Sequence, residues 1–123
     1  MAVVNKVDKR VKTSRDLVIK YQILTYCFLN EIQISNSDLN CLAELAKKGR
    51  KELTSFCQYI SKKGIFKSSQ SCRNALAKAE KKKLIIKDGS NKKTIYLNQD
   101  INVQTEGTIL LDYKILGIET QES

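Results

Sequence analysis

Residues 68–97 read SSQSCRNALAKAEKKKLIIKDGSNKKTIYL, and this stretch decides the fold. The serine cluster at its start supplies a capping residue for a helix, which we expect to run from about residue 69 to residue 82. The runs 84–87 and 94–97 are rich in residues that favour strands. The intervening Asp-Gly and Ser-Asn pairs accommodate positive φ angles, so these two runs predict a β-hairpin with a basic tip.

The helix expected at residues 69–82 has one narrow apolar face and one broad polar face. Its buried face would consist of Cys72, Leu76 and either Ala79 or Ala75, small residues that allow close approach to neighbouring helices. The outward face would carry Gln70, Arg73, Asn74, Lys78, Lys81 and Lys82.

Three further helices are expected upstream. The first is predicted from the N-cap Ser14 to about Asn30, and Ile32 and Ile34 then form a short extended link. Its expected core face is Leu17, Tyr21, Leu24 and Phe28, widened by Ile23 and Cys27. The second begins at the Ser37-Asp38 start signal and ends at Lys47-Lys48-Gly49; the third carries Leu53, Phe56, Cys57 and Ile60 and ends at Lys62-Lys63-Gly64.

The length of 123 residues corresponds to about one domain with tails. Residues 1–13 are predicted to form a basic N-terminal arm, and residues 14–98 the folded domain. Residues 99–123 hold five acids and one lysine, and form an acidic and apolar C-terminal tail. Within that tail, the apolar run 108–116 is expected to be a strand or short helix docked on another surface.

The positive charge of the chain is concentrated in one segment. Residues 61–93 contain eleven basic side chains and two acids, which accounts for the whole formal net charge of +9. Such a concentration is typical of a surface that binds a polyanion, because each neutralised phosphate releases condensed counterions. The alternative is a solvated basic face that only aids solubility.

Several function classes are disfavoured by the composition. The chain has no apolar run of about 18 residues and no signal-peptide pattern, so we expect neither a membrane span nor export by that route. The four cysteines are widely spaced and there is no histidine, so we expect buried thiols, no metal and no cofactor. Neither a glycine-rich phosphate loop nor an activated nucleophile is evident, so an enzyme is not expected.

The order helix, helix, Ser-rich turn, helix, hairpin resembles the winged helix-turn-helix superfamily, including MarR-like and related bacterial and phage domains. The resemblance rests on the segment 68–87 and the hairpin up to Leu97, within a region of residues 37–98. It implies that helix 69–82 is a recognition helix and that residues 84–97 form a wing. Lys83 departs from the pattern, because the superfamily usually has glycine there.

The resemblance also implies which side chains meet DNA. It places Ser69, Gln70, Arg73, Asn74 and Lys78 on the groove-facing side of the recognition helix, and Lys92 and Lys93 against backbone phosphates. With the nearby basic residues, the expected DNA-binding set is Lys67, Ser69, Gln70, Arg73, Asn74, Lys78, Lys81, Lys82, Lys92 and Lys93. Lysines outnumber groups that can bond bases bidentately, so backbone contacts should dominate.

The sequence therefore predicts a mainly α protein with a small β-hairpin, an α+β winged helix that binds double-stranded DNA without catalysis. A role in transcription, replication or nucleoid organisation would place it in the cytoplasm, as a homo-oligomer or bound to other subunits through its C-terminal tail. The alternative is a structural or adaptor component of a larger nucleoprotein assembly, such as a tailed-phage connector or neck, in which case it would be found in the virion. No small-molecule substrate is expected under either interpretation.

Overall fold

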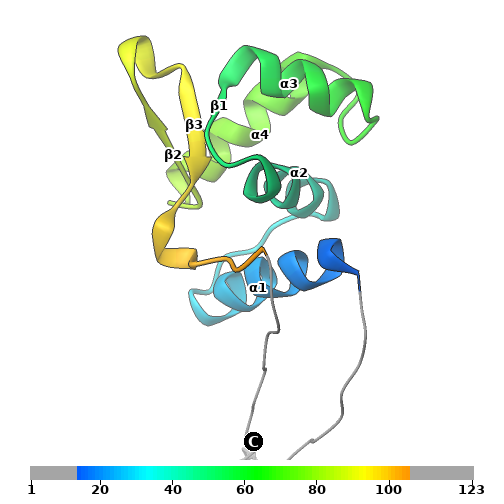
Figure 1. Cartoon of the computed structure of the whole chain (residues 1–123), viewed down its shortest axis with the longest axis vertical. Coiled ribbons are helices and arrows are strands. Elements are labelled where there is room, and N and C mark those ends of the chain that lie inside the picture. The colour runs from blue at the N-terminus through cyan, green and yellow to red at the C-terminus, as the bar shows by residue number, and fades with distance from the viewer. Residues whose placement is uncertain (1–13, 106–123) are drawn as a thin grey trace, which may run out of the picture.

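The computed structural model describes residues 14–105 of the chain, which form a mainly helical α+β fold with one small antiparallel sheet (Figure 1). The expected arm 1–13, and the part of the expected tail beyond residue 105 that includes 108–116, lie outside the described residues. The elements are α1 (Arg15–Leu29), α2 (Asn36–Lys48), β1 (Lys51–Glu52), α3 (Leu53–Lys62), α4 (Ser69–Lys81), β2 (Ile85–Asp88), the 3-10 turn η1 (Ser90–Lys92), β3 (Thr94–Leu97) and the 3-10 turn η2 (Gln99–Ile101).

The sheet has the strand order β1-β3-β2, and both pairings are antiparallel. The β2–β3 hairpin confirms the predicted one, with Ile86 opposite Tyr96. Gly89 has a φ of 83°, the left-handed conformation that the turn was expected to need. Strand β1 was not predicted from the sequence; it pairs Lys51 with Ile95.

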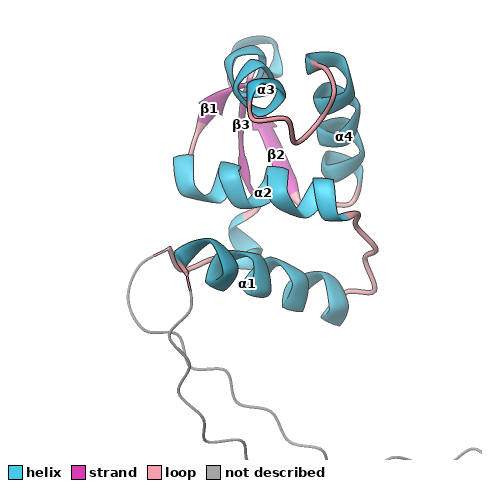
Figure 2. Ribbon diagram, turned by 90° about the vertical axis from the view of Figure 1, so that its right-hand side faces the viewer, coloured by secondary structure: helices cyan, strands magenta, loops and turns pink. Residues whose placement is uncertain are grey.

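The helices of the described residues are stacked one above another. In Figures 1 and 2, α2 lies between α1 at one end and the α3–α4 pair at the other. The tip of the β2–β3 hairpin lies on the same half as α3 and α4, and both ends of the described chain lie beside α1. The molecule therefore has an α1 end and an α4–hairpin end.

One hydrophobic core joins all four helices to the sheet. Helices α3 and α4 present the predicted apolar faces, since Phe56, Cys57 and Ile60 are buried against Cys72, Leu76 and Ala79. Ile85 and Ile95 add the inner face of the hairpin. Burial of each such aliphatic or aromatic side chain contributes about 1.5–3 kcal/mol, so this shared core holds the hairpin against the helices.

The expected core face of α1 is confirmed only in part. Ile23 and Cys27, which were expected to widen that face, are buried against α2 together with Ile19, whereas the four residues that were expected to lead it are exposed. Both sets recur at helical spacing, so periodicity alone could not distinguish the core side from the outer side. The exposed residues are Leu17, Tyr21, Leu24 and Phe28.

Capping explains where the helices begin and end. The cap of α2 is Ser35 rather than the expected Ser37: the Ser35 hydroxyl accepts from the Asp38 N–H, and the Asp38 carboxylate accepts from the Ser35 N–H. At the end of α4, the Lys83 and Leu84 N–H groups donate to the carbonyls of Glu80 and Ala79, with Lys83 in the left-handed region at a φ of 62°. This glycine-like geometry ends α4 at Lys81.

A charged network ties α1, α2 and α3 together around Glu44, a mostly buried side chain of α2. The Lys63 ammonium lies 3.1 Å from the Glu44 carboxylate, and the Tyr59 hydroxyl donates to it at 3.1 Å. Lys47 bridges Glu44 at 3.4 Å and Asp16 of α1 at 2.6 Å. Burial alone would raise the pKa of Glu44, but these hydrogen bonds and positive charges hold it below its usual value.

Candidate nucleic-acid interface

Helix α4 carries an exposed polar stripe along its outer side. The Ser68 hydroxyl caps the helix by accepting from the Ser71 N–H at 3.1 Å, which sets the start of the first turn. The side chains that follow at spacings of three and four residues are all exposed, and they therefore share one face. They are Gln70, Asn74, Lys78 and Lys81.

The two amides of this stripe bond to one another, since the Gln70 amide donates to Asn74 Oδ1 at 3.0 Å. Either amide can bond the N6 and N7 edge of adenine, but the mutual bond must be exchanged for the base contact. The stripe thus offers two amides for base recognition and two point charges for phosphates.

Two residues of the expected DNA-binding set are less exposed to a ligand than the sequence suggested. Arg73 is half-buried and donates to the Thr54 hydroxyl of α3 at 2.6 Å. Ser69 is also half-buried at the start of α4. Arg73 therefore couples α4 to α3 instead of lying on the free stripe.

The remaining expected lysines lie on either side of the stripe. Lys67 is exposed in the loop before α4, and Lys82 is exposed at its end, where its ammonium donates to the Gln33 carbonyl of the α1–α2 link at 2.7 Å. Lys92 and Lys93 are exposed at the hairpin tip. The Lys93 carbonyl accepts from the Leu53 N–H at 2.7 Å, which ties the base of the tip to the start of α3.

The structure also brings Arg50 to the hairpin, a residue absent from the expected set. Its guanidinium lies 4.0 Å from the centre of the Tyr96 ring and 3.4 Å from the Asp88 carboxylate. The exposed Lys51 follows it on β1. The sequence predicts a helix end at Lys47-Lys48-Gly49 and indicates no role for Arg50 and Lys51, whose contribution to the hairpin depends on the unpredicted strand β1.

All four cysteines are buried free thiols, as expected. Three of them, which are distant in sequence, lie in the core shared by α2, α3 and α4: they are Cys41, Cys57 and Cys72, and Cys72 interacts with the other two. Burial and the neighbouring Cys72 thiol raise the pKa of Cys57 to about 12, and contact with Cys41 together with burial raises that of Cys72. Cys57 and Cys72 are thus protonated core groups at neutral pH.

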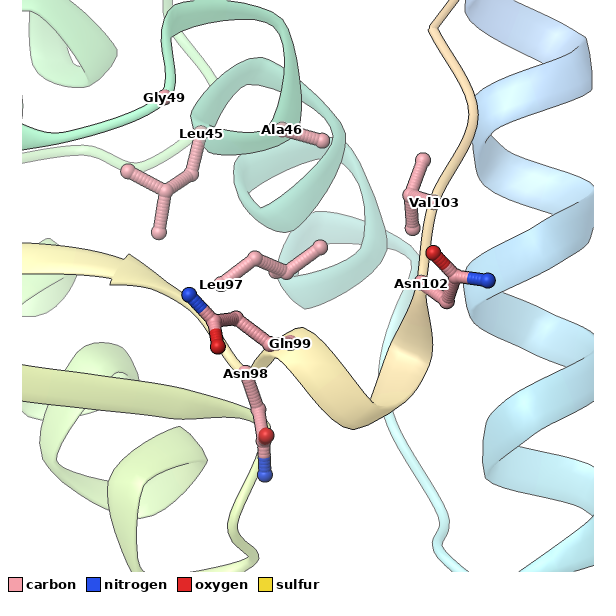
Figure 3. Close-up of a pocket in the computed structure, with 8 residues that line it drawn as sticks. All are labelled: Leu45, Ala46, Gly49, Leu97, Asn98, Gln99, Asn102 and Val103. Atoms are coloured by element: carbon pink, nitrogen blue, oxygen red, sulfur yellow. The ribbon is translucent and has the colours of Figure 1, made fainter.

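A shallow pocket lies away from the α4 stripe, where the end of α2 meets the end of β3 and η2 (Figure 3). No charged side chain lines it, and the Asn98 amide already donates to the Lys83 carbonyl at 2.7 Å. We therefore assign no ligand to it. Its lining residues are Leu45, Ala46, Gly49, Leu97, Asn98, Gln99, Asn102 and Val103.

A comparison of the chain with known protein families, curated proteins and solved structures found no match. Within residues 14–105, no helix is both long and apolar enough to cross a membrane. The same residues contain no cluster of three or more Cys, Asp or Glu side chains placed to hold a metal ion. The functional assignment therefore depends on the surface described above.

Proposed function

We propose that the chain is a winged helix-turn-helix protein that binds duplex DNA without catalysing a reaction. In this assignment α3 and α4 form the helix-turn-helix, α4 is the recognition helix, and the β2–β3 hairpin is the wing. The observation that carries the proposal is the exposed α4 stripe on the same half of the molecule as the basic hairpin tip. Such a pairing lets a helix enter the major groove while the wing contacts phosphates.

Backbone contacts would dominate the affinity. The free groups on this half are mainly lysine ammoniums, which act as point charges toward phosphates. Arg73, the only arginine of α4, is engaged by Thr54, and the two stripe amides engage each other. The proposed activity is accordingly tight, salt-dependent duplex binding with modest sequence preference, which suits a role in transcription, replication or nucleoid organisation.

A titration of the full chain with duplex DNA at low and physiological salt tests the proposal, with light scattering on the same samples. The logarithm of affinity should fall linearly with the logarithm of salt concentration. Lys92→Ala with Lys93→Ala should lower the magnitude of this slope by about 1.8, since each duplex phosphate contact contributes about 0.9.

A matched control removes two positive charges from the α1 end, with Arg15→Ala and Lys20→Ala. This variant should keep the slope of the wild-type chain if the hairpin contacts phosphates locally. An equal fall in both variants would overturn the proposed docking. Absent binding, with growth into large particles in light scattering, would instead favour the structural component of an assembly.

A further inference from the structure

Helix α1 exposes a continuous apolar stripe on the side away from α2. Phe28 is 82% exposed and Tyr21 51% exposed, and Leu17 and Leu24 complete the series. The spacings of four, three and four residues place all four side chains on one face. Single apolar residues scattered over a surface are normal in soluble proteins. Four of them on one face of a helix form a contiguous apolar patch, and such a patch indicates a binding surface.

The described chain ends beside this same helix. The Gln22 amide donates to the Gln104 carbonyl at 2.8 Å, and its oxygen accepts from the Gln104 N–H at 2.7 Å. The Arg15 Nε donates to the Thr105 carbonyl at 2.8 Å. Residues 104–105 therefore run antiparallel to α1, and Thr105 is bonded to the first residue of that helix, two positions before Leu17 begins the stripe.

The sequence that follows is apolar and of suitable length. After Glu106 and Gly107 comes the run 108–116, whose apolar residues are Ile109, Leu110, Leu111, Tyr113, Ile115 and Leu116. Nine residues span at most about 30 Å when extended and about 13 Å when helical. The stripe from Leu17 to Phe28 extends about 16 Å along α1, so the run covers all of it when extended and most of it when helical. Gly107 permits a reversal of the chain.

We propose that residues 108–116 bind the Leu17–Phe28 stripe of the same chain. The connection from Thr105 is only two residues long, which gives the segment a local concentration in about the millimolar range. A second copy of the chain at micromolar concentration would compete poorly for the same face. The occupied face lies at the α1 end, so the α4–hairpin end stays free for duplex DNA.

Thiol labelling of the full-length chain tests this proposal. Leu24→Cys places a reporter in the stripe, while the four native cysteines are buried and react slowly. The rate of alkylation by iodoacetamide is compared between the native tail and a tail carrying Leu110→Asp with Leu111→Asp. A segment that is bound for nine-tenths of the time slows labelling about tenfold, and the acidic substitutions should abolish that protection.

Two controls isolate the segment. Thr120→Asp with Gln121→Asp adds the same charge outside 108–116, and it should leave the reporter protected. Gln58→Cys, a reporter on the exposed side of α3, should react equally fast with all three tails. Phe28→Cys serves as the stripe reporter if Leu24→Cys reduces folding, because Phe28 is the most exposed residue of the stripe.

Three outcomes would overturn the proposal. Equal and rapid labelling with every tail would mean that the face is uncovered. Protection that increases with protein concentration and ignores the tail substitutions would assign the face to a second copy. Protection that requires both the native tail and high concentration would assign it to the tail of a neighbouring copy.

Discussion

At the scale of single residues, Lys83 occupies a backbone position that favours glycine. It follows α4 with a φ of 62°, and the two hydrogen bonds that end the helix require this geometry. Lys83→Gly should raise the free energy of unfolding by about 0.5–1 kcal/mol, because glycine adopts the left-handed region without steric cost. Urea unfolding followed by circular dichroism measures the change.

A glycine inside the same helix should change the free energy of unfolding in the opposite direction, and it serves as the control. Lys78→Gly should lower the free energy of unfolding by about 1 kcal/mol, because Lys78 is an exposed position inside α4, where glycine is a poor helix former. Destabilisation by both substitutions would show that Lys83 is held by its side chain rather than limited by its backbone.

Glu44 should make stability depend on pH in the acid range. Its pKa is lowered in the folded chain, so its contribution is present above the ordinary value of 4.5 and is lost as pH falls through the folded pKa. Glu44→Gln should lower the free energy of unfolding at neutral pH by about 1–3 kcal/mol and flatten its decline as the pH falls below the ordinary carboxyl value of 4.5.

The matched control for Glu44 is Glu52→Gln, at an exposed carboxylate on β1. Urea unfolding across the same pH series should give the wild-type profile for this variant. An unchanged profile for Glu44→Gln would contradict the stabilising role of the Glu44 network.

At the scale of elements, sequence patterns located the helices well but did not identify the faces of all of them. The predicted helix 69–82 and strand 94–97 agree with the observed α4 and β3, because caps, turn residues and periodicity all act locally. Strand β1 could not be predicted, since two residues paired across the chain leave no local pattern. The apolar faces of α1 were confused because only tertiary packing distinguishes them.

The same distinction applies to the candidate interface. The exposed positions of Gln70, Asn74 and Lys78 follow from helical spacing, so the sequence predicted them. The half-buried state of Arg73 depends on Thr54 in the neighbouring helix, and the position of Arg50 depends on β1. Contacts of this kind join residues that are far apart in sequence, which local spacing does not report.

Different residues of the α4 stripe should determine base preference and affinity. Gln70→Ala with Asn74→Ala should reduce discrimination between AT-rich and GC-rich duplexes, because the amides are the stripe groups suited to adenine. Lys78→Ala with Lys81→Ala should lower affinity for both duplexes, since lysines contact phosphates. Competition titrations at a fixed salt concentration measure both effects, and the reverse pattern would exclude α4 as the base-reading helix.

At the scale of the whole molecule, the question is whether DNA binds the folded surface or only the excess positive charge. The unfolded chain carries the same formal net charge of +9, so a purely electrostatic interaction would bind both states. A ligand that binds the folded state alone raises its stability, by about 2.7 kcal/mol at a hundred times the Kd. Duplex DNA at low salt should therefore raise the Tm, with a smaller rise for the Lys92→Ala, Lys93→Ala variant. Differential scanning calorimetry measures this shift. Binding that leaves the Tm unchanged would show that DNA interacts only with the net charge, and the basic segment would then be a solvated charged face without a specific binding surface.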